Sequence, residues 1–134
     1  MRYAILCYNR EQVVDNWSED KDRAVMAHHQ TVLERLAGEG KIGPVLRLMP
    51  TTTATTVRAA KQPVIIDGPF AETKEQLLGL FVVDVETLDE ALGIAAELSV
   101  EPGAMEVRPL HFFRDFSIQA FRLPDQVPQS VEEG

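Results

Sequence analysis

The stretch LLGLFVVDVETLDEALGIA (Leu77–Ala95) decides the fold class, because a strand pattern in it is followed directly by a helix pattern. Leu77–Val85 is an apolar run rich in β-branched residues, which is typical of a buried strand. Thr87 and Glu90 have the spacing of a capping box that begins a helix. The apolar positions of that helix are Leu88, Ala91, Leu92 and Ala95. The stretch therefore predicts a strand–helix unit.

A similar unit opens the chain. Arg2–Tyr8 alternates as a strand does, and Ser18 provides an N-cap for a helix whose first turn is acidic. Gly38 and Gly40 supply its end. Four residues spaced at i, i+4, i+7 and i+11 lie on one face of this helix: Val25, His29, Val32 and Leu36. We expect that face to pack on the sheet.

Short candidate strands lie between the two units, and a last strand follows them. Polar turns separate the central strands, which favours hairpins: Val45–Met49, Ala54–Arg58 and Val64–Ile66. The last strand, Ala104–Leu110, follows the turn at Pro102 and Gly103. The order of elements predicts an α+β fold, a ferredoxin-like split βαβ pattern with an enlarged central hairpin region.

Such a sheet, of about five strands, carries both helices on one face, so its other face needs cover. A chain of 134 residues has little left to supply it, and we therefore expect a homodimer that packs sheet on sheet. Residues 1–112 are predicted to form the domain and residues 113–134 a tail. We expect the apolar part of the tail to dock on a subunit and its end to be disordered: Phe116, Ile118, Phe121 and Leu123 form that apolar part.

Composition narrows the function classes. The net charge is -8, and no basic stripe matches a row of phosphates, so nucleic acid is excluded as a partner. The longest apolar runs are too short to span a bilayer, and the N-terminus does not continue as a signal peptide, which predicts a cytoplasmic protein without a membrane partner. A single cysteine excludes an internal disulfide, and Cys7, inside an apolar strand, is interpreted as a core residue.

The segment DGPFAETKE (Asp67–Glu75) is the candidate site. An Asp side chain that bonds to nearby backbone N–H groups, followed by Gly68 and Pro69, predicts a rigid corner. Thr73–Gln76 matches a capping box, which predicts a short helical turn after the corner. The ionisable groups here offer a proton donor, a proton acceptor and a positive charge, although solvated charges on a rigid turn are the alternative: Asp67, Glu72, Lys74 and Glu75.

The sequence allows two interpretations of His29. It is either a core histidine bonded to a backbone carbonyl, or an acid–base group beside a carboxylate at the edge of the sheet. His28 points away from it, so the pair does not form a metal site. Phosphate-loop, nucleophile-elbow and dinucleotide motifs are absent from the sequence, and we predict no cofactor. Arg58 is either a ligand for an anionic substrate or a surface arginine.

These residues resemble a known family. The string DGPFAETKEQL (Asp67–Leu77) is similar to the motif of the DGPF-domain proteins of the YCII-related group, and the likeness covers roughly Met1–Leu110. Shorter matching strings are ATTVR at residues 54–58, Gly79 with VDV at residues 83–85, LDEAL at residues 88–92 and EVRP at residues 106–109. The tail lies outside the resemblance.

We predict a small-molecule pocket built from the corner, the first helix near His29 and the sheet between them. The resemblance implies a dimeric α+β barrel of ferredoxin-like subunits, bacterial and cytoplasmic, whose biochemical role is generally unassigned. It also implies acid–base catalysis through a histidine of the first helix and an aspartate, here His29 and Asp67. Residues that would bind the substrate are Arg58, Gly68, Pro69, Phe70, Glu72 and Lys74. The alternative is a non-catalytic sensor or accessory protein linked to sigma factors.

One departure concerns the pocket. The family pattern after the motif resembles LGGFY, whereas this chain has LLGLF at residues 77–81. Leu78 thus stands in place of a glycine, and we expect it to narrow or dry a pocket beside the corner.

Overall fold

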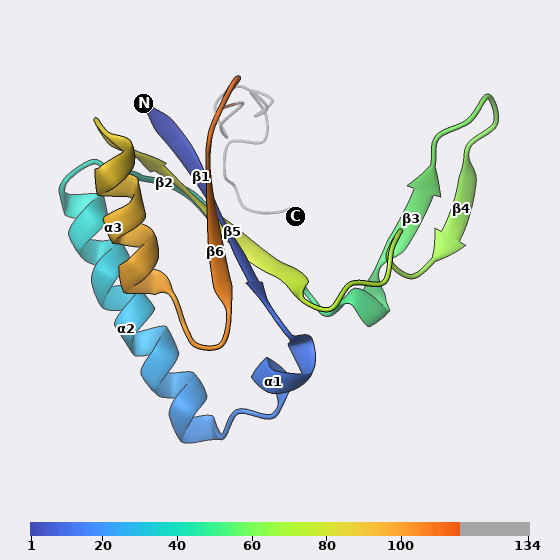
Figure 1. Ribbon diagram of the computed structural model, residues 1–134, viewed down its shortest axis with the longest axis horizontal. Coiled ribbons are helices and arrows are strands. Elements are labelled where there is room, and N and C mark those ends of the chain that lie inside the picture. The colour runs from blue at the N-terminus through green and yellow to red at the C-terminus, as the bar shows by residue number, and fades with distance from the viewer. Residues whose placement is uncertain (116–134) are drawn as a thin grey trace, which may run out of the picture.

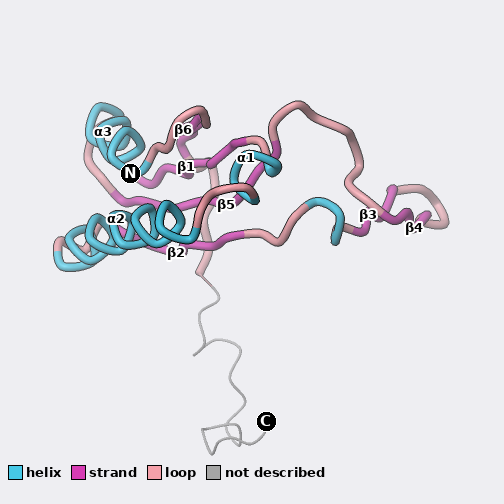
Figure 2. The backbone as a smooth tube through the Cα atoms, turned by 90° about the horizontal axis from the view of Figure 1, so that it is seen from below, coloured by secondary structure: helices cyan, strands magenta, loops and turns pink. Residues whose placement is uncertain are grey.

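The computed structural model describes residues 1–115, and four strands in it form the main sheet. The strands are β1 (Arg2–Asn9), β2 (Ile42–Arg47), β5 (Gln76–Asp84) and β6 (Ala104–Pro109), in the spatial order β2-β5-β1-β6 with antiparallel neighbours. Two helices, α2 (Glu19–Gly38) and α3 (Leu88–Leu98), cover one face (Figures 1 and 2). This α+β arrangement is compatible with the predicted ferredoxin-like fold. The predictions for residues 116–134 lie outside the described part of the chain.

Local sequence signals define the two long helices as predicted. The Ser18 hydroxyl accepts a hydrogen bond from the Lys21 N–H at 3.0 Å, and the Thr87 hydroxyl accepts one from the Glu90 N–H at 3.1 Å. Both are N-caps that satisfy donors left free by the first helical turn. Helix α2 ends at Gly38, two residues before Gly40 adopts a positive φ of 70°.

The core lies between the helices and the sheet. Opposite residues of antiparallel strands share a face, so the Tyr3–Val83 and Ile5–Phe81 pairs both point toward the helices. Helix α2 contributes Val32 and Leu36, the two residues expected on its packing face that are fully buried. Helix α3 contributes Ala91, Ile94, Ala95 and Leu98. Among residues 1–115, no helix is long and apolar enough to span a bilayer.

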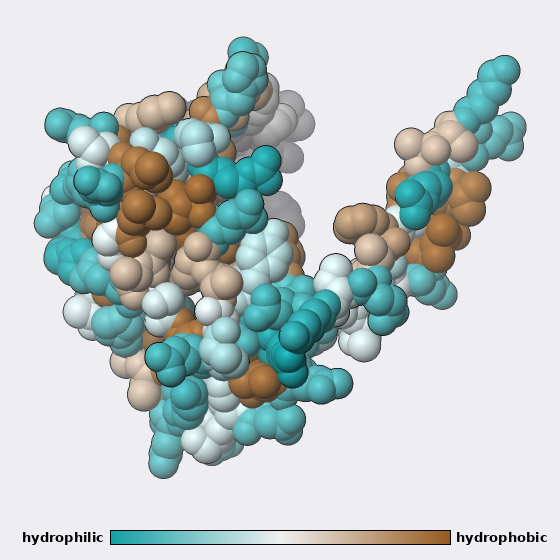
Figure 3. Space-filling model, in the orientation of Figure 1, coloured by the Kyte–Doolittle hydropathy of each residue, from teal (hydrophilic) through white to brown (hydrophobic). Residues whose placement is uncertain are grey.

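The central hairpin is present, but it does not join the main sheet. Strands β3 (Thr55–Arg58) and β4 (Val64–Asp67) pair only with each other and form an arm that projects from the body (Figures 1 and 2). Within residues 1–115 the main sheet therefore has four strands, not the five or so that we expected. Brown apolar atoms are exposed along the arm in Figure 3. We call residues 55–67 the arm.

Two short helices at the base of the arm were not predicted, because neither is long enough to show an apolar period. They are α1 (Glu11–Asp15) and the 3-10 helix η1 (Thr51–Thr53). The Glu11 carboxylate ties them together, since it accepts hydrogen bonds at 2.7 Å from both the N–H and the hydroxyl of Thr51. The Gln76 side chain accepts a further bond at 2.9 Å from the Glu11 N–H. The base of the arm is thus attached to the body.

The predicted helical turn at Thr73–Gln76 is wrong, because these residues form bends and the start of β5. The Thr73 hydroxyl donates to the Glu75 carbonyl at 2.6 Å, and the Gln76 side-chain amide donates to the Thr73 carbonyl at 2.8 Å. The capping side chains are therefore used as donors to carbonyls, which leaves no cap for a helix.

Candidate functional site

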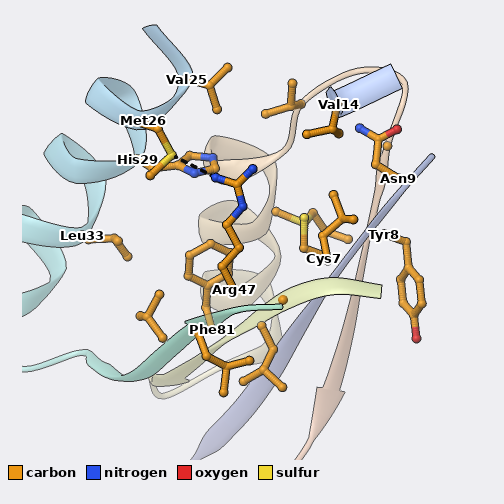
Figure 4. A pocket seen from close by; sticks show the side chains of 18 of the residues that line it. Cys7, Tyr8, Asn9, Val14, Val25, Met26, His29, Leu33, Arg47 and Phe81 are labelled. Atoms are coloured by element: carbon orange, nitrogen blue, oxygen red, sulfur yellow. Dashed lines mark hydrogen bonds between the residues drawn. The ribbon is translucent and has the colours of Figure 1, made fainter. Parts of the chain in front are cut away.

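A cavity of about 340 Å³ lies between α2 and the sheet (Figure 4). This volume is at the lower end of the range of roughly 300–1,000 Å³ that is usual for small-molecule sites. Its walls come from β1, β2, β5, β6 and α2, so rigid elements position nearly all of its side chains. The lining is mainly apolar and includes Val25, Met26, Leu33, Val45, Phe81 and Met105.

Few polar side chains reach this cavity. Among residues 1–115, the lining residues that carry a charge or can titrate are Cys7, Tyr8, His29 and Arg47, and none of these described lining residues is an aspartate or a glutamate. Figure 4 shows the Tyr8 ring directed away from the others. An apolar cavity with a few convergent polar groups is the usual form of a ligand site.

His29 is held in the wall by α3 and the sheet. Its Nε2 atom lies 2.9 Å from the Leu98 carbonyl oxygen, and its ring meets the Phe81 ring edge-on with 6.0 Å between centroids. A carbonyl only accepts hydrogen bonds, so Nε2 carries the proton and Nδ1 keeps the lone pair in the neutral ring. Among residues 1–115, no group bonds to Nδ1. The carbonyl contact is the one expected of a core histidine, yet the ring also lines the cavity.

His28 has a different place. Its Nε2 atom lies 2.7 Å from the Glu97 carbonyl oxygen, and the residue is exposed and does not line the cavity. The two neighbouring imidazoles therefore both bond to carbonyls at the C-terminal end of α3, but His29 alone faces the cavity.

Sequence reasoning missed Arg47. It lies in β2 directly opposite Gly79 of β5, and its side chain extends toward Met26 and His29 of α2 (Figure 4). Its Nη1 atom is 3.7 Å from the Met26 sulfur, and no ion pair holds Arg47 within the described chain. The available signal was a basic residue inside the apolar run VLRLM, at residues 45–49.

The Cys7 thiol is half-buried in the cavity wall. Burial raises the pKa of this thiol above its ordinary value, and the nearby positive charge of Arg47 partly opposes that effect. The neutral thiol is thus favoured at pH 7, which suits a packing residue more than a nucleophile.

We expect Cys7 to react slowly with iodoacetamide at pH 7 and to reach half-maximal rate above the pH usual for a free thiol. Arg47→Gln should slow it further at neutral pH, because removing the cation removes the influence that lowers the pKa. Alkylation followed by mass spectrometry against pH measures both, with no other cysteine in the chain to interfere. A faster reaction in Arg47→Gln would contradict this electrostatic coupling.

The corner proposed from sequence lies at the arm, not at this cavity. Gly68 has a positive φ of 98°, its N–H donates to the Ala54 carbonyl at 2.8 Å, and its own carbonyl accepts from the Thr56 hydroxyl at 2.7 Å. This geometry suits glycine and fixes the corner. Gly68, Pro69 and Glu72 line a separate hollow of about 240 Å³ with parts of η1.

The remaining predicted site residues are exposed on or beside the arm. Arg58, Asp67, Phe70 and Lys74 line neither the main cavity nor the corner hollow, and Phe70 is 74% exposed. Within one chain, the structure therefore does not bring Asp67 to His29. No group of three or more potential metal ligands occurs among residues 1–115.

Comparison with known proteins agrees with the resemblance seen in the sequence. The family model of the YCII-related domain matches residues 1–114. An uncharacterized protein of Rhizobium meliloti (strain 1021) is 48% identical over 118 residues, which cover 85% of this chain and 95% of the relative. The chain belongs to the YCII-related family.

Proposed function

We propose that this protein binds a small molecule in the cavity beneath α2, acts on it by cofactor-free acid–base chemistry and works as a homodimer. The observation that supports the binding site most strongly is the lining: an apolar cavity to which the described chain contributes an imidazole, a guanidinium and a thiol but no carboxylate. Arg47 is exposed and His29 is partly buried, so a ligand that enters the cavity can contact both groups.

His29 is the proposed general base. The Leu98 carbonyl fixes the ring and its tautomer, and Nδ1 is free to take a proton from a bound molecule. Backbone orientation thus does part of the work that sequence reasoning gave to Asp67. None of the described lining residues offers His29 a carboxylate partner.

Two surfaces support the proposed homodimer. The face of the sheet opposite the helices carries apolar residues that are exposed or partly exposed, from three neighbouring strands, namely Ala4, Leu6, Leu46 and Leu80. The arm exposes Val57 and Ile65, which are cross-strand partners, at 62% and 72%. A two-stranded hairpin alone is marginal in water and needs a surface to pack on. A second copy would supply cover for both.

His29→Gln tests the base, because glutamine keeps an N–H donor for the Leu98 carbonyl but has no basic nitrogen. For a substrate found by screening, we expect turnover to fall about 10²–10⁴-fold while ligand affinity changes little. His28→Gln is the matched control, since His28 makes the same kind of carbonyl contact outside the cavity.

Unchanged turnover in His29→Gln, or an equal loss in His28→Gln, would remove the base assignment. Ligand binding with no turnover in the wild type would instead favour the non-catalytic sensor.

A further inference from the structure

We infer that the ligand is an apolar molecule with a single anionic group, such as a carboxylate, and that Arg47 binds that group. The inference rests on the proposed ligand site and names its substrate class.

The electrostatics of the cavity carry the inference. Arg47 is the one permanently charged residue among the described residues of the lining, in a chain whose net charge is -8. The contact at 3.7 Å with the Met26 sulfur is weak and leaves the charge without a counterion. Arg47 is exposed to solvent, so an anion bound in the cavity would replace water at the guanidinium with a charge-assisted hydrogen bond.

Several other cations of the described chain have acidic partners. Arg23 and Arg35 pair with Asp20 and Glu97 at the exposed surface, and Lys41 pairs with the partly buried Glu90. Arg35 holds Glu97 through two bonds, of 2.9 and 2.6 Å. Arg47 thus combines a place in the cavity wall with the lack of any such acidic partner among residues 1–115.

The shape of the site favours a ligand that has one anionic group and an apolar remainder. The guanidinium is a planar fork that binds both oxygens of a carboxylate. Figure 4 shows the Arg47 side chain reaching from β2 toward α2, while apolar side chains form most of the remaining wall. A carboxylate held there would present the rest of the ligand to the apolar wall and to His29.

Intrinsic fluorescence gives a direct assay, because Trp17 is the single tryptophan of the chain and lines the cavity. Octanoate, 1-octanol and octylammonium are probes of equal chain length with different charge. In the wild type we expect octanoate to bind at least about tenfold more tightly than octanol. A hydrogen bond to a charged group typically strengthens binding by about tenfold or more.

Arg47→Gln should weaken octanoate binding about 10–100-fold and leave octanol within about twofold. Arg47→Lys, which keeps the charge but loses the fork, should retain a weaker preference for the anion. Arg23→Gln removes the same charge from α2 away from the cavity and should bind octanoate as the wild type does.

Equal binding of octanoate and octanol to the wild type, or a preference for octylammonium, overturns the anion inference but leaves the ligand site standing. If Arg23→Gln loses as much octanoate affinity as Arg47→Gln, the inference is also overturned. The loss would then reflect the net charge of the protein and not a contact with Arg47. Binding of none of the three probes overturns the ligand site itself. These wild-type comparisons decide the question even if Arg47→Gln does not fold.

Discussion

Replacing Gly79 with valine is expected to lower the free energy of unfolding by about 2–4 kcal/mol, because β2 lies against the α-carbon of Gly79. A Cβ atom at this position would lie 2.3 Å from the Leu46 carbonyl oxygen and 3.1 Å from the Arg47 Cα atom. Both neighbours are backbone atoms, so neither can rotate away. The β2–β5 pairing would have to shift, and Arg47 would move with it.

Gly93→Ala is the matched control for Gly79→Val. Gly93 lies within α3 with nothing inside 4 Å of an added Cβ atom, so alanine there should stabilise by up to about 1 kcal/mol. Urea unfolding followed by circular dichroism measures both variants. An unfolding midpoint for Gly79→Val equal to that of the wild type would contradict the close approach of the two strands.

The second large effect concerns the arm. Changing Val57 and Ile65 together to aspartate should weaken self-association by more than about 100-fold, because two apolar side chains per subunit would be replaced by charges in the proposed interface. The residues share one face of the arm, opposite each other in the pairing of β3 with β4. Sedimentation equilibrium at micromolar concentration measures the change.

Lys61→Asp is the control for this pair, since it changes the net charge of the arm by the same two units at the exposed turn. It should remain dimeric, and circular dichroism of all variants should show the same folded body. A monomeric wild type would refute the homodimer. A Val57/Ile65 double variant that associates as tightly as Lys61→Asp would remove the arm from the interface.

Local signals made much of the fold predictable. The caps at Ser18 and Thr87, the glycine end of α2 and the long apolar run before α3 each act within a few residues, and the structure confirms all of them. The separation of the arm was not predictable in this way. A hairpin pattern specifies which strands pair with each other, but not whether the pair joins a larger sheet.

The candidate site was predicted only in part. Helical periodicity placed His29 on the packing face, where the cavity lies, and the family resemblance singled it out as a candidate acid–base group. Arg47 could be identified as a cavity residue only from the register of β2 on β5, which places it opposite Gly79. That register is fixed by tertiary pairing. The dense charges near Asp67 drew attention to the corner, yet in one chain the corner belongs to the base of the arm.

A crystal structure with octanoate bound is the measurement that tests the proposed site most directly. We expect the carboxylate within hydrogen-bonding distance of the Arg47 guanidinium, with the alkyl chain between α2 and the sheet beside Phe81 and His29. Octanoate in the corner hollow at Gly68 and Pro69, with the cavity beneath α2 empty, would contradict it.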